Sequence, residues 1–345
     1  MDSVVARILV ESAVKIALLF VVLLTAVAYM TLVERRVSAW IQDRRGPNRV
    51  GPFGLLQPLA DGIKFLFKEA VTPPHVYRPV YLLAPMLIFI PALVTFSVIP
   101  VGPALELFGH KVRLQIADVD NGILVVLAFA SMGVYGVALA GWSSSNKYSL
   151  MGGLRSSAQL ISYELAMGIS IVGVLMAAGS LRLNDIVERQ IEHGWNVIWQ
   201  LPGFLIFLTS AFAETNRLPF DLPEAETELV AGYHTEYSGM RFSMFYMAEY
   251  LNMITASALA ATLYCGGYHV PGLHLLGLPA AAAALVQVLA FGLKVGFFLF
   301  VYVWVRWTLP RFRYDQLMNL GWKVLLPTAL VHVLWVSFVV LMDWT

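Results

Sequence analysis

Charged side chains are scarce in this chain of 345 residues. Asp, Glu, Lys and Arg make up only 13% of it, whereas hydrophobic residues make up 59%. A soluble domain typically has about 25% charged residues, so the composition excludes an ordinary soluble domain and predicts a polytopic membrane protein. The formal net charge of +1 provides no basic surface for nucleic acid, and nucleic acid is not expected as a partner.

Cysteine is nearly absent as well, because Cys265 is the only one. A single thiol excludes a disulfide framework and a thiolate set for an iron-sulfur cluster or a structural zinc. The histidines lack metal-ligand spacing, and the sequence has no phosphate-binding glycine loop, no Gly-x-Ser-x-Gly and no His-Glu-x-x-His. We therefore expect no catalytic residue, no metal ligand and no bound cofactor in this chain, and any electron carrier must lie in a partner.

Long apolar runs are what the chain has in abundance. A helix needs roughly 20 apolar residues to cross the hydrocarbon core of a bilayer. Eight runs qualify, at residues 8–33, 80–101, 119–141, 158–179, 196–213, 242–266, 283–306 and 322–342, and the fifth is the shortest. The sequence therefore predicts an all-α protein with eight transmembrane helices. Glu34, Arg35 and Arg36 follow the first run at once, which indicates a retained span rather than a cleaved signal.

Lysine and arginine are distributed unevenly among the loops between these runs. The odd-numbered loops hold sixteen of them, and the even-numbered loops hold four, namely Lys111, Arg113, Arg182 and Arg189. Because cytoplasmic loops carry the excess of basic residues, we expect the odd-numbered loops to be cytoplasmic and both termini to lie on the outer, periplasmic side. No fixed-period repeat or low-complexity linker divides the chain, so a single membrane domain over residues 1–345 is expected.

The first inner loop, residues 34–79, contains a helical pattern of its own. Apolar residues recur at Leu55, Leu56, Leu59, Ile63, Leu66 and Phe67, and polar residues including Asp61 and Lys64 occupy the complementary positions. This spacing predicts an amphipathic helix at about residues 53–70, lying at the membrane face. Two interpretations stay open, namely an ordinary interfacial anchor and a polar cluster where a cytosolic partner or an amphiphilic ligand docks.

A second inner loop, residues 214–241, is unusually acidic. Its carboxylates are Glu214, Asp221, Glu224, Glu226, Glu228 and Glu236, opposed by Arg217 and Arg241. Asp221 as an N-cap and Glu224 three residues on, as in a capping box, explain about two of these acids. Like charges four residues apart repel on a helix, so capping does not explain Glu224 together with Glu228. A purely structural acidic loop is one alternative, and an ion or proton path is favoured.

Three ionisable residues lie within the apolar runs themselves: Glu164, Glu249 and Lys294. Each is costly at the centre of a membrane. One interpretation is mutual ion pairing that only holds helices together. The other is a ladder of carboxylates, formed by Glu164 and Glu249 with Glu214, whose desolvation and mutual repulsion would tune them for proton transfer.

Several stretches resemble the sequences of a known family almost residue for residue. They are GPNRVGPFGLLQPLADGIKFLFKE (46–69), LISYELAMG (160–168), AETNRLPFDLPEAETELVAGYHTEYSGMRFSMFYMAEY (213–250) and RFRYDQLM (311–318). On these stretches the chain is similar to the NADH dehydrogenase subunit 1 family of respiratory complex I, the proton-pumping NADH:quinone oxidoreductase. Membrane-bound hydrogenases contain a related subunit, but the sequence from Pro219 to Tyr237 resembles that of the quinone-reducing branch of the family.

The resemblance implies an all-helical subunit without a redox centre that forms the membrane part of a quinone cavity. It implies that FMN and iron-sulfur clusters lie in partner subunits, that two of these partners complete the cavity from the peripheral arm, and that small membrane subunits lie alongside. The location implied is the bacterial inner membrane, with the mitochondrial inner membrane as the other option. The residues implied for quinone access and binding are Arg35, Trp40, Arg44, Asp61, Phe242 and Tyr246, and those for proton coupling are Glu164, Glu214, Asp221, Glu224, Glu226, Glu228 and Glu249.

A secondary transporter for cations or carboxylates is the alternative from a different class. Its coupling site would be the buried acids. Transporters commonly have paired halves with broken helices near mid-membrane, and no paired halves are evident in this sequence. A transporter would also work when purified alone, whereas a complex I subunit would co-purify with an iron-sulfur arm, and the related hydrogenase subunit with a nickel-iron partner.

Overall fold

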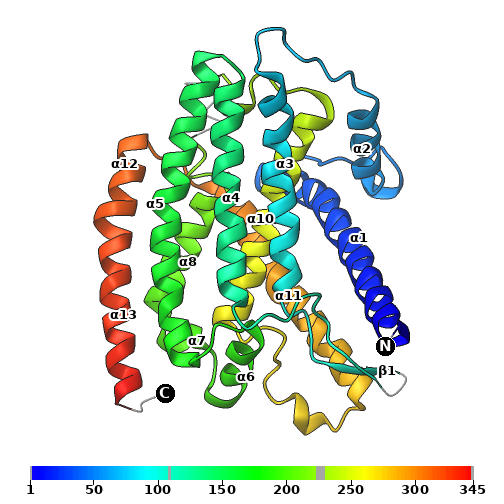
Figure 1. Ribbon diagram of the computed structural model, residues 1–345, viewed down its shortest axis with the longest axis vertical. Coiled ribbons are helices and arrows are strands. Elements are labelled where there is room, and N and C mark those ends of the chain that lie inside the picture. Colours follow the sequence, from blue (N-terminus) through cyan, green and yellow to red (C-terminus); the bar gives the residue numbers. More distant parts are fainter. Residues whose placement is uncertain (1, 108–109, 223–229, 343–345) are drawn as a thin grey trace.

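The computed structural model describes residues 2–107, 110–222 and 230–342. It is a bundle of long helices, some of which run along its long axis while others are tilted across it (Figure 1). The long helices are α1 (Asp2–Ile41), α3 (Arg78–Thr95), α4 (Gly122–Ser143), α5 (Lys147–Ala178), α10 (Gly239–Tyr264) and α11 (Ala280–Thr308). The shorter ones are α2 (Gln57–Phe67), α6 (Leu183–His193), α7 (Asn196–Trp199), α8 (Leu201–Glu214), α12 (Tyr314–Asn319) and α13 (Leu326–Leu341).

Six of the described helical segments are long and apolar enough to cross a membrane. They are Leu9–Ile41, Arg78–Val98, Gly122–Ser143, Lys147–Ala178, Ala280–Thr308 and Tyr314–Leu341. The last combines α12, a π-helical turn (η5, Leu320–Leu325) and α13. Pro327 in the first turn of α13 lacks an N–H donor, which is a common reason for such an irregular turn.

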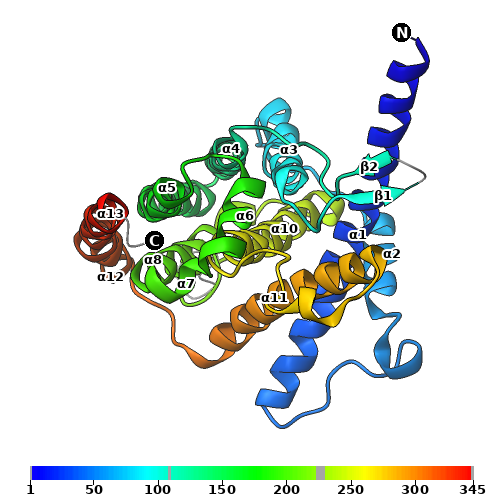
Figure 2. The same cartoon turned by 90° about the horizontal axis from the view of Figure 1, so that it is seen from below.

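The prediction of eight spans is therefore supported for six. Helices form at the other two runs, but α8 has only 14 residues, and α10 carries Arg241, Glu249 and several hydroxyl side chains. The composition of α10 follows from its position, because it packs against α3, α8 and α11 in the middle of the bundle (Figure 2). A helix surrounded by other helices does not need an apolar surface on every side.

The all-α prediction needs one small correction. An antiparallel hairpin of two short strands, β1 (Leu105–Leu107) and β2 (His110–Val112), lies in the connection between α3 and α4, and Leu105 is opposite Val112 in its register. The remaining short elements are turns of 3₁₀ helix: η1 (Pro52–Gly54), η2 (Phe96–Val98), η3 (Gly232–His234) and η4 (Leu273–Leu276).

The two ends of the bundle differ in what they carry. The start of α1, the end of α13, the hairpin, α6 and α7 lie at one end, and α2 lies toward the other (Figure 1). We name these the terminal end and the α2 end. Helix α2 forms within the segment where the sequence predicts an amphipathic helix, and its apolar residues Leu59, Ile63, Leu66 and Phe67 are exposed. Asp61 holds α2 to α1 through an ion pair with Arg35, 2.8 Å from Nη1 to Oδ2.

Glycine allows α4 and α5 to approach closely. A Cβ atom on Gly141 would lie 2.6 Å from the carbonyl oxygen of Ser149 and 3.1 Å from the Cα of Gly153. Real Cβ atoms do not approach backbone oxygen that closely, so any larger residue would push the two helices apart. The same helix offers a contrast at Gly133, where nothing lies within 4 Å of the position of a Cβ atom.

We expect Gly141→Ala to lower the free energy of unfolding by about 1–3 kcal/mol, the usual cost of overpacking. Thermal unfolding of the purified protein measures the effect. Gly133→Ala is the matched control in the same helix, and it is expected to leave the unfolding midpoint unchanged or slightly raised. Equal midpoints for both variants would show that the contact between α4 and α5 is not tight.

Candidate functional site

Arg217 joins three parts of the chain inside the bundle. It lies in the loop after α8, and its Nη1 donates to both carboxylate oxygens of Glu34 in α1, at 3.1 Å each. Its Nε contacts the carboxylate of Glu249 in α10. The exposed fraction is 3% for Arg217 and 6% for Glu34. Burial removes hydration from these charges, so the ion pairs between them are required.

The local sequence explains how Arg217 reaches this position. Helix α8 ends at Glu214, and Asn216 adopts a left-handed backbone conformation, with φ at 50°, which Asn tolerates better than most residues. Gln159 of α5 then holds the turn on both sides, because its Nε2 donates to the carbonyls of Ala213 and Phe220 at 2.8 Å each. The turn therefore directs Arg217 back toward α1 and α10.

Further partners surround the same carboxylate. The hydroxyl of Tyr250 donates to Glu34 Oε2 at 2.7 Å, and Arg306 from the last turn of α11 contacts Glu34 Oε1. The guanidinium of Arg217 also lies 4.4 Å from the centre of the Tyr250 ring, within range of a cation–π interaction. Glu34 is thus held by two arginines and a tyrosine from three different segments.

Asp221 forms a second ion pair beside this group. Arg311, in the connection between α11 and α12, donates from Nη2 to Asp221 Oδ2 at 3.1 Å. Burial raises the pKa of Asp221, although Arg311 and then Arg306 favour its charged form. The three carboxylates Glu34, Asp221 and Glu249 and the three arginines Arg217, Arg306 and Arg311 balance in charge. We call these six residues the charge network.

Glu214 extends the charge network toward space that water can fill. Two small cavities, of about 40 Å³ and about 30 Å³, share Glu214, Thr215 and Asn252 in their linings, and the larger is also lined by Glu249. A water molecule requires roughly 10–15 Å³ by this measure, together with polar partners. Each cavity can therefore hold water, and water can connect Glu214 with Glu249.

Glu164 is a further acid near Glu214. It belongs to α5, which packs along α8, and the charge of Glu164 acts on Glu214. The order Glu249, Glu214 and Glu164 leads from α10 through α8 to α5. The structure thus brings together the three intramembrane or membrane-edge acids that the sequence singles out.

The other residues suggested by the resemblance fall into three groups. Phe242 and Tyr246 pack edge-on against His234, with ring centres 5.2 Å and 5.8 Å away. Arg35 and Asp61 form the ion pair between α1 and α2. Trp40, which is 72% exposed, and Arg44, which donates to Gln42 at 2.6 Å, lie on the surface. Glu224, Glu226 and Glu228 lie outside the described residues.

His234 contributes a neutral polar group beside these aromatic rings. Burial lowers its pKa to about 4, because an imidazolium ion would lose hydration there. The imidazole is therefore uncharged at physiological pH. The rings of Phe242 and Tyr246 thus form an aromatic group that includes the uncharged imidazole of His234.

Sequence reasoning missed Glu34, Tyr250 and Arg306 as members of the site. The sequence contains a signal for two of them, namely a charged residue at the end of an apolar run. Glu34 directly follows the first run, and Arg306 is the last residue of the seventh. Sequence reasoning also left open an ion pair for Lys294. In the structure the Lys294 ammonium instead donates to the carbonyls of Cys265, Gly267 and His269 at 2.7, 2.9 and 2.8 Å, and so it holds the end of α10 against α11.

These features define a polytopic helical membrane protein with a buried, charge-balanced network of carboxylates and arginines. A family model described as NADH dehydrogenase matches residues 14–337. An H subunit of NADH-quinone oxidoreductase from Geobacter metallireducens is 54% identical over 328 residues, which cover 95% of this chain and 96% of the relative. Another H subunit of this oxidoreductase, from Koribacter versatilis, is 52% identical over 348 residues, covering 96% and 97%. The chain belongs to the family of NADH-quinone oxidoreductase H subunits, which confirms the resemblance found in the sequence.

We expect Arg217→Met to destabilise the protein strongly, because it leaves the buried carboxylates of Glu34 and Glu249 without their shared partner. Breaking a buried ion pair from one side costs about 3–5 kcal/mol. The thermal unfolding midpoint of the purified protein measures the loss. Arg313→Met is the control, because Arg313 pairs with Asp315 on the exposed surface, and it should barely move the midpoint. Equal small shifts for the two variants would contradict the role given to Arg217.

Proposed function

We propose that this chain forms the membrane part of the quinone cavity of NADH-quinone oxidoreductase and couples quinone reduction to proton translocation. It acts as one subunit of that oxidoreductase, as the names of its relatives state. The observation that carries the proposal is the charge network, which lies next to a cavity lined by Glu214 and Glu249. In this function the chain contributes no catalytic residue and no metal ligand.

The proposed topology has eight spans in a single membrane domain. We take helices α8 and α10 to cross the membrane together with the six longer segments. The position of the start of α1 and of the end of α13 at the same end of the bundle supports an even number of crossings (Figure 1). The α2 end then faces the cytoplasm, where the basic loops are expected. The membrane proposed is the bacterial inner membrane.

Quinone access is proposed to lie between α1, α2 and the start of α10. The exposed apolar residues of α2 suit the quinone tail, and the Arg35–Asp61 pair offers a polar edge to the headgroup. Phe242 and Tyr246 line the inner part with His234. Trp40 and Arg44 lie at the surface, so we assign them to the mouth of this route.

We propose that the charge balance of the network couples quinone reduction to proton movement. Reduction of a quinone to a quinol takes up protons, which changes the charge beside the α2 end. A buried network with equal numbers of acids and arginines responds to such a change, because one added or removed proton leaves a buried charge without compensation. We assign Asp221, Glu224, Glu226 and Glu228 to the sensing loop. Glu249, Glu214 and Glu164 then pass the change into the membrane.

Partner subunits supply the redox chemistry in this proposal. FMN and iron-sulfur clusters belong to the peripheral arm, two subunits of which complete the cavity above the α2 end. Small membrane subunits and lipid cover the sides of the bundle. The buried acids alone would also suit a transporter or the related hydrogenase subunit, but the names and the nearly full-length similarity of the relatives favour the quinone-reducing enzyme.

We expect Glu214→Gln to lower NADH:quinone turnover in the assembled complex, because the amide cannot release a proton to the cavity. The decrease should be at least about tenfold if proton transfer through this residue contributes as general acid–base steps usually do. Glu192→Gln is the control, because the Glu192 side chain is 73% exposed, and it should keep full turnover. Unchanged turnover and unchanged proton pumping in Glu214→Gln would refute the coupling route.

We expect Arg35→Ala to raise the apparent KM for quinone more than it lowers kcat, since it removes the polar edge proposed at the access route. Asp61→Asn removes the same ion pair and should act in the same direction. Steady-state kinetics with a short-chain and a long-chain quinone measures both constants. Arg49→Ala, at an exposed position in the same loop, is the control. An unchanged apparent KM in both test variants would exclude this route.

We expect a reporter domain fused after Thr345 to be active on the outer side of the membrane, because an even number of crossings leaves both ends outside. A periplasm-specific phosphatase and a cytoplasm-specific fluorescent protein give the two readouts. Fusion of the same reporters within the first basic loop is the matched control, with the opposite result. Cytoplasmic activity after Thr345 would overturn the topology.

A further inference from the structure

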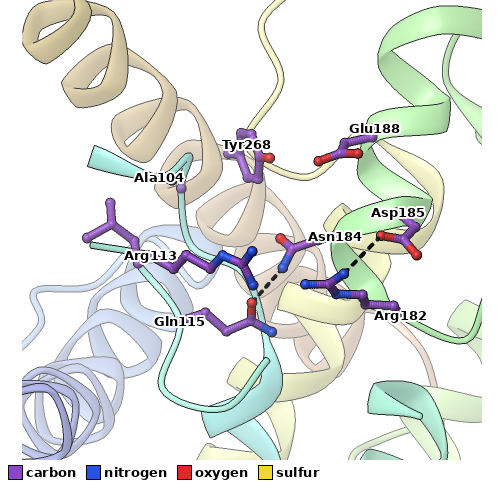
Figure 3. Close-up of a pocket in the computed structure, with 10 residues that line it drawn as sticks. Ala104, Arg113, Gln115, Arg182, Asn184, Asp185, Glu188 and Tyr268 are labelled. Atoms are coloured by element: carbon purple, nitrogen blue, oxygen red, sulfur yellow. Dashed lines mark hydrogen bonds and ion pairs between the residues drawn. The ribbon is translucent and has the colours of Figure 1, made fainter. Parts of the chain in front are cut away.

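A large polar cavity lies at the terminal end of the bundle, away from the charge network. It has a volume of about 490 Å³ and is bordered by Gly102, Ala104 and the residues from Arg113 to Gln115, by α6 and by Tyr268 after α10. Figure 3 shows Glu188 and Tyr268 on one side of this cavity and Arg113 and Gln115 on the other. Neither the quinone route nor the proton route uses it.

The lining of the cavity presents both signs of charge in equal number, with Arg113 and Arg182 against Asp185 and Glu188. Asp118, which does not line the cavity, accepts from both Arg113 and Arg182, and Arg182 also lies 3.9 Å from Asp185. The Arg113 side chain is 54% exposed, so part of its guanidinium faces the open space. A ligand that fits needs both a negative and a positive group.

The walls of this cavity are held in place by hydrogen bonds. Asn184 donates from Nδ2 to Gln115 Oε1 at 2.7 Å, and Gln115 is buried and donates to the carbonyl of Val98. The hydroxyl of Ser180 donates to Asp185 Oδ2 at 2.7 Å. Burial and then the charge of Glu188 raise the pKa of Tyr268, which indicates that the phenol and the carboxylate are close. The site is therefore built before a ligand arrives.

A second, mostly apolar cavity of about 340 Å³ is lined by sequence neighbours of residues in the polar one. It is lined by Ile191, His269, Val270, Leu273, Gly277, Leu278, Ala283 and Gln287. Ile191 is one helical turn beyond Glu188 on α6, and His269 follows Tyr268 directly. On α11, Gln287 lines the apolar cavity while Val288 lies against Gly102 of the polar one. Both cavities are therefore bordered by α6 and by the segment after α10, and together they can receive the two parts of one amphiphile.

We propose that the paired cavities bind a zwitterionic phospholipid with a primary ammonium headgroup, of the phosphatidylethanolamine class. Its phosphate lies at Arg113, its ammonium lies between Glu188 and Asp185 near the Tyr268 hydroxyl, and an acyl chain enters the apolar cavity. The two carboxylates of the lining, Asp185 and Glu188, disfavour a purely anionic lipid. A quaternary ammonium has no N–H groups to donate to the acids, so a choline headgroup is a poorer match. The proposal rests on the topology given above, which brings the terminal end to the outer leaflet.

The test measures lipid retained by the assembled complex after reconstitution into nanodiscs of equal phosphatidylethanolamine and phosphatidylglycerol, followed by detergent washing. Mass spectrometry counts the retained lipids by class. Glu188→Gln and Arg113→Gln should each lower the retained phosphatidylethanolamine about tenfold, the effect of losing one charged hydrogen bond. Glu192→Gln is the control on the same helix, because its side chain is 73% exposed and does not line the cavity.

Quinone turnover, measured in the same samples, should stay at the wild-type level in all three variants, so this test and that of the coupling route can fail separately. Equal retention of phosphatidylethanolamine by the wild type, Glu188→Gln and Arg113→Gln would overturn the proposal. Preferential retention of phosphatidylglycerol would overturn the charge argument and with it the proposal. A peptide segment of a partner subunit occupying the polar cavity in a structure of the complex would do the same.

Discussion

The position of Arg217 between Glu34 and Glu249 is the constraint on which the rest of the structure depends. One guanidinium joins α1, the loop after α8 and α10 in a place where water is largely excluded. Without it, two buried carboxylates would each lose their main compensation. The cation–π contact with Tyr250 and the ion pair from Arg306 to Glu34 add further fixed partners, so the helices around the site must keep one arrangement.

A balanced set of buried charges is sensitive to single protons. The charge network has as many arginines as carboxylates among its six residues, and burial raises the pKa of Asp221 toward protonation. In the function proposed above, quinone reduction next to such a network would require either a proton transfer or a shift of the loop that carries Arg217 and Asp221. The small cavities at Glu214 give that proton a place to go through water. Coupling then needs no redox group in this chain.

The bundle keeps two kinds of chemistry at its two ends. The α2 end has exposed apolar side chains, the Arg35–Asp61 pair and the aromatic group around His234. The terminal end has the polar cavity with its hydrogen-bonded walls and the second, mostly apolar cavity. Helix α10 runs between these ends, and Lys294 donates to three carbonyls in the segment that follows it. A lipid bound at the terminal end would therefore contact the same segment that closes α10.

The sequence by itself determined the membrane class, the approximate positions of the long apolar helices and the family, because apolar runs and long shared sequence motifs are local properties of the chain. It also singled out Glu164, Glu214 and Glu249, since an acid inside an apolar run is conspicuous. Only the tertiary structure decided their partners: Arg217 meets Glu34 across 183 residues of sequence, and Lys294 binds three carbonyls instead of an acid. Helix packing brings these groups together. The spacing of residues along the chain does not show which distant side chains will be buried next to one another.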